Sequence, residues 1–250
     1  MKKHFLVLTT AIVSFVIVSC SKEKTETDQS ISNPAVEQAA SPNATAERLV
    51  VDPLLVNLDG RFEFNGNLKD ETKKLADGTI VNYRGALYTY DRKGVAKAAI
   101  KFNGNYGVNL FNVPQQTHGS ISVWVKYDNP NLGTGRMIVK PKKIGLGVGK
   151  FMTEMEGSVE WLPNYSMGIH VEPVDKNWHH FVVTFDDDIL RLYEDGQLVK
   201  YNASTLTYPK VLQDYFVGYR NNEWFEGAVD DLRFYSRTLS ATDVQKLYNL

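Results

Sequence analysis

From about Leu54 onward, short runs of alternating apolar and polar residues recur along the chain. Such runs are typical of β-strands with one buried face, because successive side chains of a strand point to opposite sides. The clearest are VNLDGRFEF, KAAIKF, GSISVWVKY, HHFVVTF, ILRLYEDGQLV and GAVDDLRFY. Asp195-Gly196, inside the fifth run, indicates a tight hairpin, since a type I′ turn needs positive φ at both central positions. The pattern predicts an all-β fold, a two-sheet antiparallel sandwich of the jelly-roll type.

One helix is predicted, and it comes at the end of the sequence. Ser240 can cap it, and Asp243 stands three residues later, which is the spacing of a capping box. Val244, Leu247 and Tyr248 then share one apolar face at helical spacing. We therefore expect a short C-terminal helix beside the strands.

The first residues follow a different pattern. Lys2 and Lys3 precede an apolar stretch over 5–18, which is the charge and length distribution of a signal peptide and too short for a membrane-spanning helix. The stretch ends in Ile-Val-Ser followed by Cys20, the only cysteine of the chain, and this resembles a bacterial lipobox. The resemblance implies cleavage after residue 19 and lipidation of Cys20. A plain secretory signal or a buried free thiol is the alternative.

Residues 20–50 carry no aromatic side chain and are rich in charged and small polar residues. A segment of this composition cannot bury enough apolar surface to offset the entropy lost on ordering, so we expect a flexible tether. It begins with Ser-Lys-Glu-Lys, which resembles export signals of Bacteroidetes surface lipoproteins. The expected protein is an outer-membrane lipoprotein, exposed to the periplasm or at the cell surface, held to the bilayer by its acyl anchor and carrying one domain over 51–250.

Composition gives no sign of a nucleic-acid partner. The chain has 28 Lys and Arg against 29 Asp and Glu; removing Lys2 and Lys3 with the signal peptide leaves 26 against 29, a net charge of about −3. Hydrophobic residues make up 43% of the sequence, which is enough for a sizeable core. With Cys20 lipidated, disulfides and thiolate metal sites are excluded as sources of stability.

Several segments resemble a known family in the right order. They are KAAIKFNGNYGVNL, GSISVWVK, NWHHFVVTFDDDILRLYEDGQLV and FEGAVDDLRFYSRTLSATDVQKLY. From about Phe62 to Tyr248 the chain is similar to the concanavalin A-like, laminin-G-like jelly rolls. This fold includes lectins, glycan-binding modules, glycoside hydrolases and adhesion domains, so the function has to be argued from a site.

The sequence offers weak candidates for catalysis. Glu154 and Glu156 would share one face of a strand, but the central aspartate of the glucanase pattern is absent and Glu160 comes too late. His179 and His180 are adjacent, so on a strand they would point to opposite faces and could not form a metal pair. We expect a protein that is not an enzyme, with a divergent glycoside hydrolase as the alternative.

The resemblance implies a structural calcium ion. In the family such an ion ties the loop after the first strand to two aspartates on the last strand. The corresponding residues here are Asn65, Asn67, Asp70, Asp230 and Asp231. Oxygen donors of this kind suit calcium. The alternative is a pair of loops held by hydrogen bonds alone.

Two groups of residues are candidates for ligand binding, because a flat aromatic ring beside amide and charged groups suits sugar recognition. One group is Trp224 with Tyr219, Arg220 and Asn222, and the other is Trp161 with Tyr165. Each group could instead simply cover a sheet. The resulting hypothesis is a non-catalytic, membrane-anchored module that binds an extracellular glycan, with a protein-binding or adhesion module as the alternative.

Overall fold

The computed structural model describes residues 51–82, 85–128, 136–141, 145–151, 154–160, 175–186, 189–203, 210–220 and 223–250. The expected signal peptide, Cys20 and the tether lie outside the described residues, as do Trp161, Tyr165 and Asn222. For Arg220 the backbone is described but the side chain is not. None of the helical segments in these ranges has the length and hydrophobicity needed to cross a membrane.

Strands make up most of the described chain. The elements are, in order, η1 (Pro53–Leu55), β1 (Leu58–Phe62), β2 (Thr79–Val81), β3 (Leu87–Thr89), β4 (Ala99–Asn103), β5 (Gly107–Gln115), β6 (Gly119–Tyr127), β7 (Arg136–Pro141), β8 (Gly145–Phe151), β9 (Glu154–Glu160), β10 (Trp178–Asp186), β11 (Ile189–Glu194), β12 (Gln197–Ala203), β13 (Val211–Val217), β14 (Tyr219–Arg220), β15 (Glu223–Trp224), β16 (Glu226–Tyr235) and α1 (Ala241–Tyr248).

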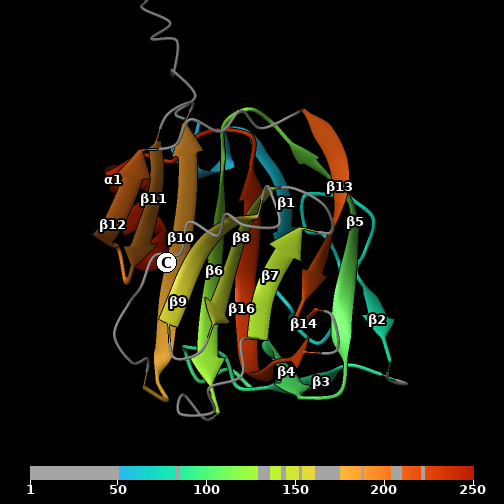
Figure 1. Ribbon diagram of the computed structural model, residues 1–250. Helices are drawn as coiled ribbons and strands as arrows, with labels where there is room; N and C mark the ends of the chain where they lie inside the picture. The colour runs from blue at the N-terminus through green and yellow to red at the C-terminus, as the bar shows by residue number, and fades with distance from the viewer. Residues whose placement is uncertain are drawn as a thin grey trace, which may run out of the picture. The chain divides into compact units, whose positions relative to one another are not determined.

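Most strands form two large antiparallel sheets that lie face to face within residues 51–250 (Figure 1), and β14 and β15 form a separate two-stranded sheet. The eight-stranded sheet has the order β12-β11-β10-β6-β16-β4-β3, and β1 pairs with β16 beside β4. The six-stranded sheet has the order β2-β5-β13-β7-β8-β9. Asp195 and Gly196 connect β11 to β12 with φ of 48° and 80°, as the turn pattern predicted. The all-β jelly-roll prediction is confirmed.

The main core lies between the two sheets. Its members come from both, because alternate residues of each strand point inward; they include Phe102, Val108, Val123, Phe181 and Val217, all fully buried. Consequently the residues between them, such as those before and after Val108 on β5, lie on the outer sides of the sandwich.

A second apolar cluster covers the outer side of the eight-stranded sheet. Val182 and Tyr193 of that sheet pack there with Val244 and Leu247 of α1. The predicted helix is confirmed, and its capping box is present, with the Ser240 hydroxyl accepting a hydrogen bond from the Asp243 amide. The two helical elements η1 and α1 therefore cover part of the eight-stranded sheet.

Candidate ligand-binding surface

The outer side of the six-stranded sheet carries aromatic residues. Tyr215 and Val217 of β13 point into the core, so Phe216 between them lies on the opposite side. The Cα of Phe216 is paired with that of Asn109 on β5, which also lies between two core residues. Directly paired residues share a face, so an aromatic ring and an amide lie side by side on this surface.

A glycine at the end of β13 brings two more rings to the same place. Gly218 has φ of 77°, and a Cβ there would lie 2.4 Å from the ring of buried Phe102. The chain turns at this glycine into the short β14–β15 hairpin, in which Tyr219 is paired with Trp224. Both strands of the hairpin lie beside β7. The turn thus places the hairpin at the end of the six-stranded sheet.

Phe216, Tyr219 and Trp224 form a continuous aromatic row. The ring centroids of Phe216 and Tyr219 are 4.9 Å apart, and those of Tyr219 and Trp224 are 5.1 Å apart with an interplanar angle of 17°. All three side chains are partly exposed. The Tyr219 hydroxyl donates a hydrogen bond of 2.6 Å to Oδ1 of Asn109. The structure therefore brings together Tyr219 and Trp224, which the sequence grouped, and adds Phe216 and Asn109, which it did not.

The ring of Tyr219, the middle ring of the row, packs against Gly107 of β5. A Cβ on Gly107 would lie 2.0 Å from Cδ1 of Tyr219, so the tyrosine ring lies directly on the strand backbone. Burial raises the pKa of Tyr219, and the hydrogen bond to Asn109 lowers it by less. The hydroxyl therefore stays protonated at neutral pH and is held in one orientation.

A charged cleft lies on the eight-stranded sheet, and some of the predicted calcium ligands line it. It has a volume of about 260 Å³ and is lined mainly by residues of β1 and the loop after it, of the segment between β3 and β4, and of β16; they include Glu63, Asn65, Asp91, Arg92, Asp230 and Asp231. The structure thus brings Asn65 together with the two aspartates of β16. Asn67 and Asp70 do not line this cleft.

The oxygens of Asp70 are directed at its own loop. The buried carboxylate accepts hydrogen bonds of 2.8 to 3.1 Å from the backbone amides of residues 61, 72, 74 and 75, and one from the Thr72 hydroxyl. Burial raises the pKa of Asp70, but these hydrogen bonds together outweigh it and the pKa is lowered. Asn67 accepts a bond from the Lys69 amide. These contacts are those of a hydrogen-bonded loop.

The two aspartates of β16 are paired with arginines. Nη1 of Arg92 lies 2.5 Å from Asp230, and Nη2 lies 3.5 Å from Asp231. Arg233 donates to both oxygens of Asp231 at 2.8 and 2.9 Å. Burial raises the pKa of Asp230 to about 7, although the charge of Arg92 lowers it. Because guanidinium groups already compensate these carboxylates, the arrangement does not fit a calcium ion held by all five predicted residues.

His179 and His180 lie on opposite faces of β10, as expected for neighbours on a strand. Nδ1 of His179 is 2.9 Å from Asp195 and Nε2 is 3.1 Å from Asp175, and chiefly the bond to Asp195 raises the pKa of His179 to about 9. In the part of the chain that the structure describes, His179, Glu194 and Asp195 are the one group of three metal-capable side chains within 4.8 Å. Both ring nitrogens of His179 are already engaged by carboxylates, Nδ1 by Asp195 and Nε2 by Asp175.

Known proteins place this architecture in a family. Residues 102–245, more than half of the chain, match the model of the concanavalin A-like lectin/glucanases superfamily. The chain belongs to this superfamily. None of the curated proteins matches it in sequence. Among solved structures, it is similar to domain 4 of AbnA, a GH43 extracellular arabinanase of Geobacillus stearothermophilus in complex with arabinotriose, with a TM-score of 0.63, 21% identity, and coverage of 77% of this chain and 98% of that one.

Binding domains of toxins have the same fold. The receptor binding domain of botulinum neurotoxin C/D mosaic serotype has a TM-score of 0.62 and 13% identity, covering 78% of this chain and 51% of that chain. The binding domain of Paraclostridial Mosquitocidal Protein 1 has a TM-score of 0.62 and 16% identity, covering 78% and 52%. The superfamily domain described here thus spans about half the length of these toxin domains.

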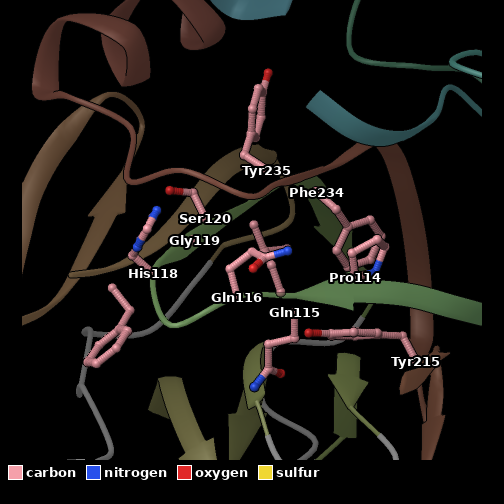
Figure 2. Close-up of a pocket in the computed structure, with 11 residues that line it drawn as sticks. Pro114, Gln115, Gln116, His118, Gly119, Ser120, Tyr215, Phe234 and Tyr235 are labelled. Atoms are coloured by element: carbon pink, nitrogen blue, oxygen red, sulfur yellow. The ribbon is translucent and has the colours of Figure 1, made fainter. Parts of the chain in front are cut away.

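One earlier candidate and one cavity remain to be placed. Glu154 and Glu156 belong to β9, whose backbone is described, but their side chains lie outside the described part of the structure. A small cavity where the ends of the two sheets meet is lined by Gln115, Ser120 and Tyr215, among others (Figure 2). Its volume is about 20 Å³, room for one water molecule and not for a sugar ring. The aromatic row is therefore the better ligand surface.

Proposed function

We propose that this superfamily member is a non-catalytic module that binds a glycan on the aromatic row. The observation that carries the proposal is the partly exposed stack of Tyr219 and Trp224 beside Asn109. An aromatic ring packs against the apolar C–H faces of a sugar, and a neighbouring amide bonds its hydroxyl groups. The arabinotriose complex of the similar arabinanase domain supports a glycan as the ligand.

The rest of the predicted ligand set extends this surface as a hypothesis. Arg220 and Asn222 follow Tyr219 in the sequence and would supply further hydrogen bonds to a bound sugar. Trp161 and Tyr165 remain the second candidate group. Their contribution is best measured by the same assay, as alanine variants tested one at a time.

The first experiment measures glycan binding by variants of the row. Trp224→Ala should weaken binding of arabinotriose, or of any glycan that the unaltered protein captures from an array, by about tenfold or more, the loss of about 1.4 kcal/mol. Tyr201→Ala is the matched control, because Tyr201 lies on β12 of the other sheet and is 65% exposed. Equal affinities of Trp224→Ala and the unaltered protein would contradict the proposal.

A protein partner is the second candidate, and one observation favours it. Leu212 of β13 is 66% exposed and lies on the same side of the sheet as Phe216, with Asp214 between them, so an exposed apolar side chain and an acidic one share the face of the aromatic row. Apolar contact area suits a protein better than a sugar. Leu212→Asp should therefore abolish binding to a protein partner and leave glycan binding unchanged.

We also propose that the protein is anchored in the outer membrane through Cys20, with 20–50 as the tether. The support is the lipobox-like sequence at the end of the apolar stretch. Labelling of growing cells with radioactive palmitate should mark the unaltered protein and not Cys20→Ala. A normally processed and membrane-bound Cys20→Ala variant would exclude the lipid anchor.

A further inference from the structure

We propose that Arg92 is a built-in cation for the aspartate pair of β16, taking the place where the family resemblance implies calcium, so that the domain folds without this ion. The inference is independent of the glycan-binding proposal, because the charged cleft and the aromatic row lie on different sheets.

The guanidinium group of Arg92 is held from two directions. It bonds Asp230 at 2.5 Å, and its Cζ lies 4.8 Å from the ring centroid of Trp124 on the neighbouring strand β6. Tyr248 of α1 also stacks on this tryptophan, with centroids 5.6 Å apart and an angle of 14°. The Arg92 side chain is only 12% exposed. Stacking and pairing together fix the cation over the carboxylates.

The local charges already balance. Asp230 and Asp231 are 4% and 7% exposed, and Arg92 and Arg233 bring one positive charge each to the pair. Two buried carboxylates side by side need such compensation, since an uncompensated buried charge is strongly destabilising. A calcium ion beside two fixed guanidinium groups would be repelled by both. The two guanidinium groups thus already offset the negative charge that a calcium ion would otherwise offset at this pair.

Removal of the Arg92 guanidinium should leave negative charge at Asp230 that a calcium ion can compensate. Without Arg92, Asp230 loses its ion pair. The cleft of about 260 Å³ still has oxygen atoms on Glu63, Asn65 and Asp91 that could bind a cation. Calcium takes six to eight oxygen ligands in flexible geometry, and water can complete the set. An Arg92→Gln variant should consequently bind calcium that the unaltered protein ignores.

The test is thermal unfolding of the detergent-solubilised full chain, in millimolar calcium chloride and in chelator. The unaltered protein should melt at the same temperature in both. Arg92→Gln should melt lower in chelator and rise by about 5–10 °C when calcium exceeds its dissociation constant a hundredfold. Arg92→Lys keeps the charge and should stay indifferent to calcium, and Arg92→Gln with Asp230→Asn should lose the response.

Three results would overturn the inference. One is a calcium-dependent rise in the unaltered protein that Asp230→Asn removes, because the ion would then be resident beside Arg92. Another is Arg92→Gln with unaltered stability and no calcium response. If Arg92→Gln does not fold in chelator, its refolding on addition of calcium supports the inference, and failure to refold in either condition contradicts it.

Discussion

Replacing Gly107 with alanine should disable the aromatic row while the sandwich still folds. The new Cβ would lie 2.0 Å from Cδ1 and 2.8 Å from Cε1 of Tyr219, whereas carbon atoms in contact prefer about 3.5–4.0 Å. The ring must move by about 1.5 Å or more, which breaks its 2.6 Å hydrogen bond to Asn109 and its stacking on Trp224. Overpacking of this kind costs about 1–3 kcal/mol, a fall in melting temperature of about 3–10 °C.

Two measurements check this reasoning. Affinity for the glycan should fall with Gly107→Ala, and the melting temperature should recover when Tyr219→Ala is added, because the clash has been removed. Gly85→Ala is the control, since no atom lies within 4 Å of its added Cβ. If Gly107→Ala binds glycan with unaltered affinity and melts at the original temperature, Tyr219 is not seated on β5 as described.

Three further predictions concern charge and catalysis. The raised pKa of His179, about 9, means that its stabilising charge is complete below pH 6.5 and is lost as pH rises to 9; the free energy of unfolding should fall over that range, and His179→Gln should flatten the curve. The lowered pKa of Asp70 gives stability above pH 3.8 that is lost as pH falls; Asp70→Asn should cost about 2 kcal/mol near pH 7, and an unchanged denaturant midpoint would contradict this. Finally, the protein should release no reducing ends from polysaccharides; turnover that Glu154→Gln or Glu156→Gln abolishes would show an enzyme.

Local signals explain what the sequence predicted well. Alternation and turn residues gave the strands and the β11–β12 hairpin, because each depends on neighbours along the chain. Tyr219 and Trp224 were grouped for the same reason, since only four residues separate them in the sequence, and the structure pairs them. The serine cap of α1 is likewise a local contact.

Contacts between distant segments explain what the sequence missed. Phe216 joins Asn109 only because β13 pairs with β5, and no local pattern announces that pairing. Arg92 lies 138 residues before Asp230, so no sequence pattern indicated that the two would form an ion pair. The hydrogen bonds that Asp70 accepts come from backbone amides, which every residue type has, so no residue pattern pointed to them. Whether calcium binds stays a prediction for experiment.

The position of β16 has a consequence for how the domain assembles. This last strand of the sequence lies inside the eight-stranded sheet, with β6 on one edge and both β4 and β1 on the other. The early strands β1, β4 and β6 therefore lack the strand that joins them until residues 226–235 have been synthesised. Pairings of such long sequence separation are slow, because the loop between the partners must close before any contact forms. The domain should therefore fold only after nearly all of residues 51–250 have been made, and a chain truncated before residue 226 should stay unfolded.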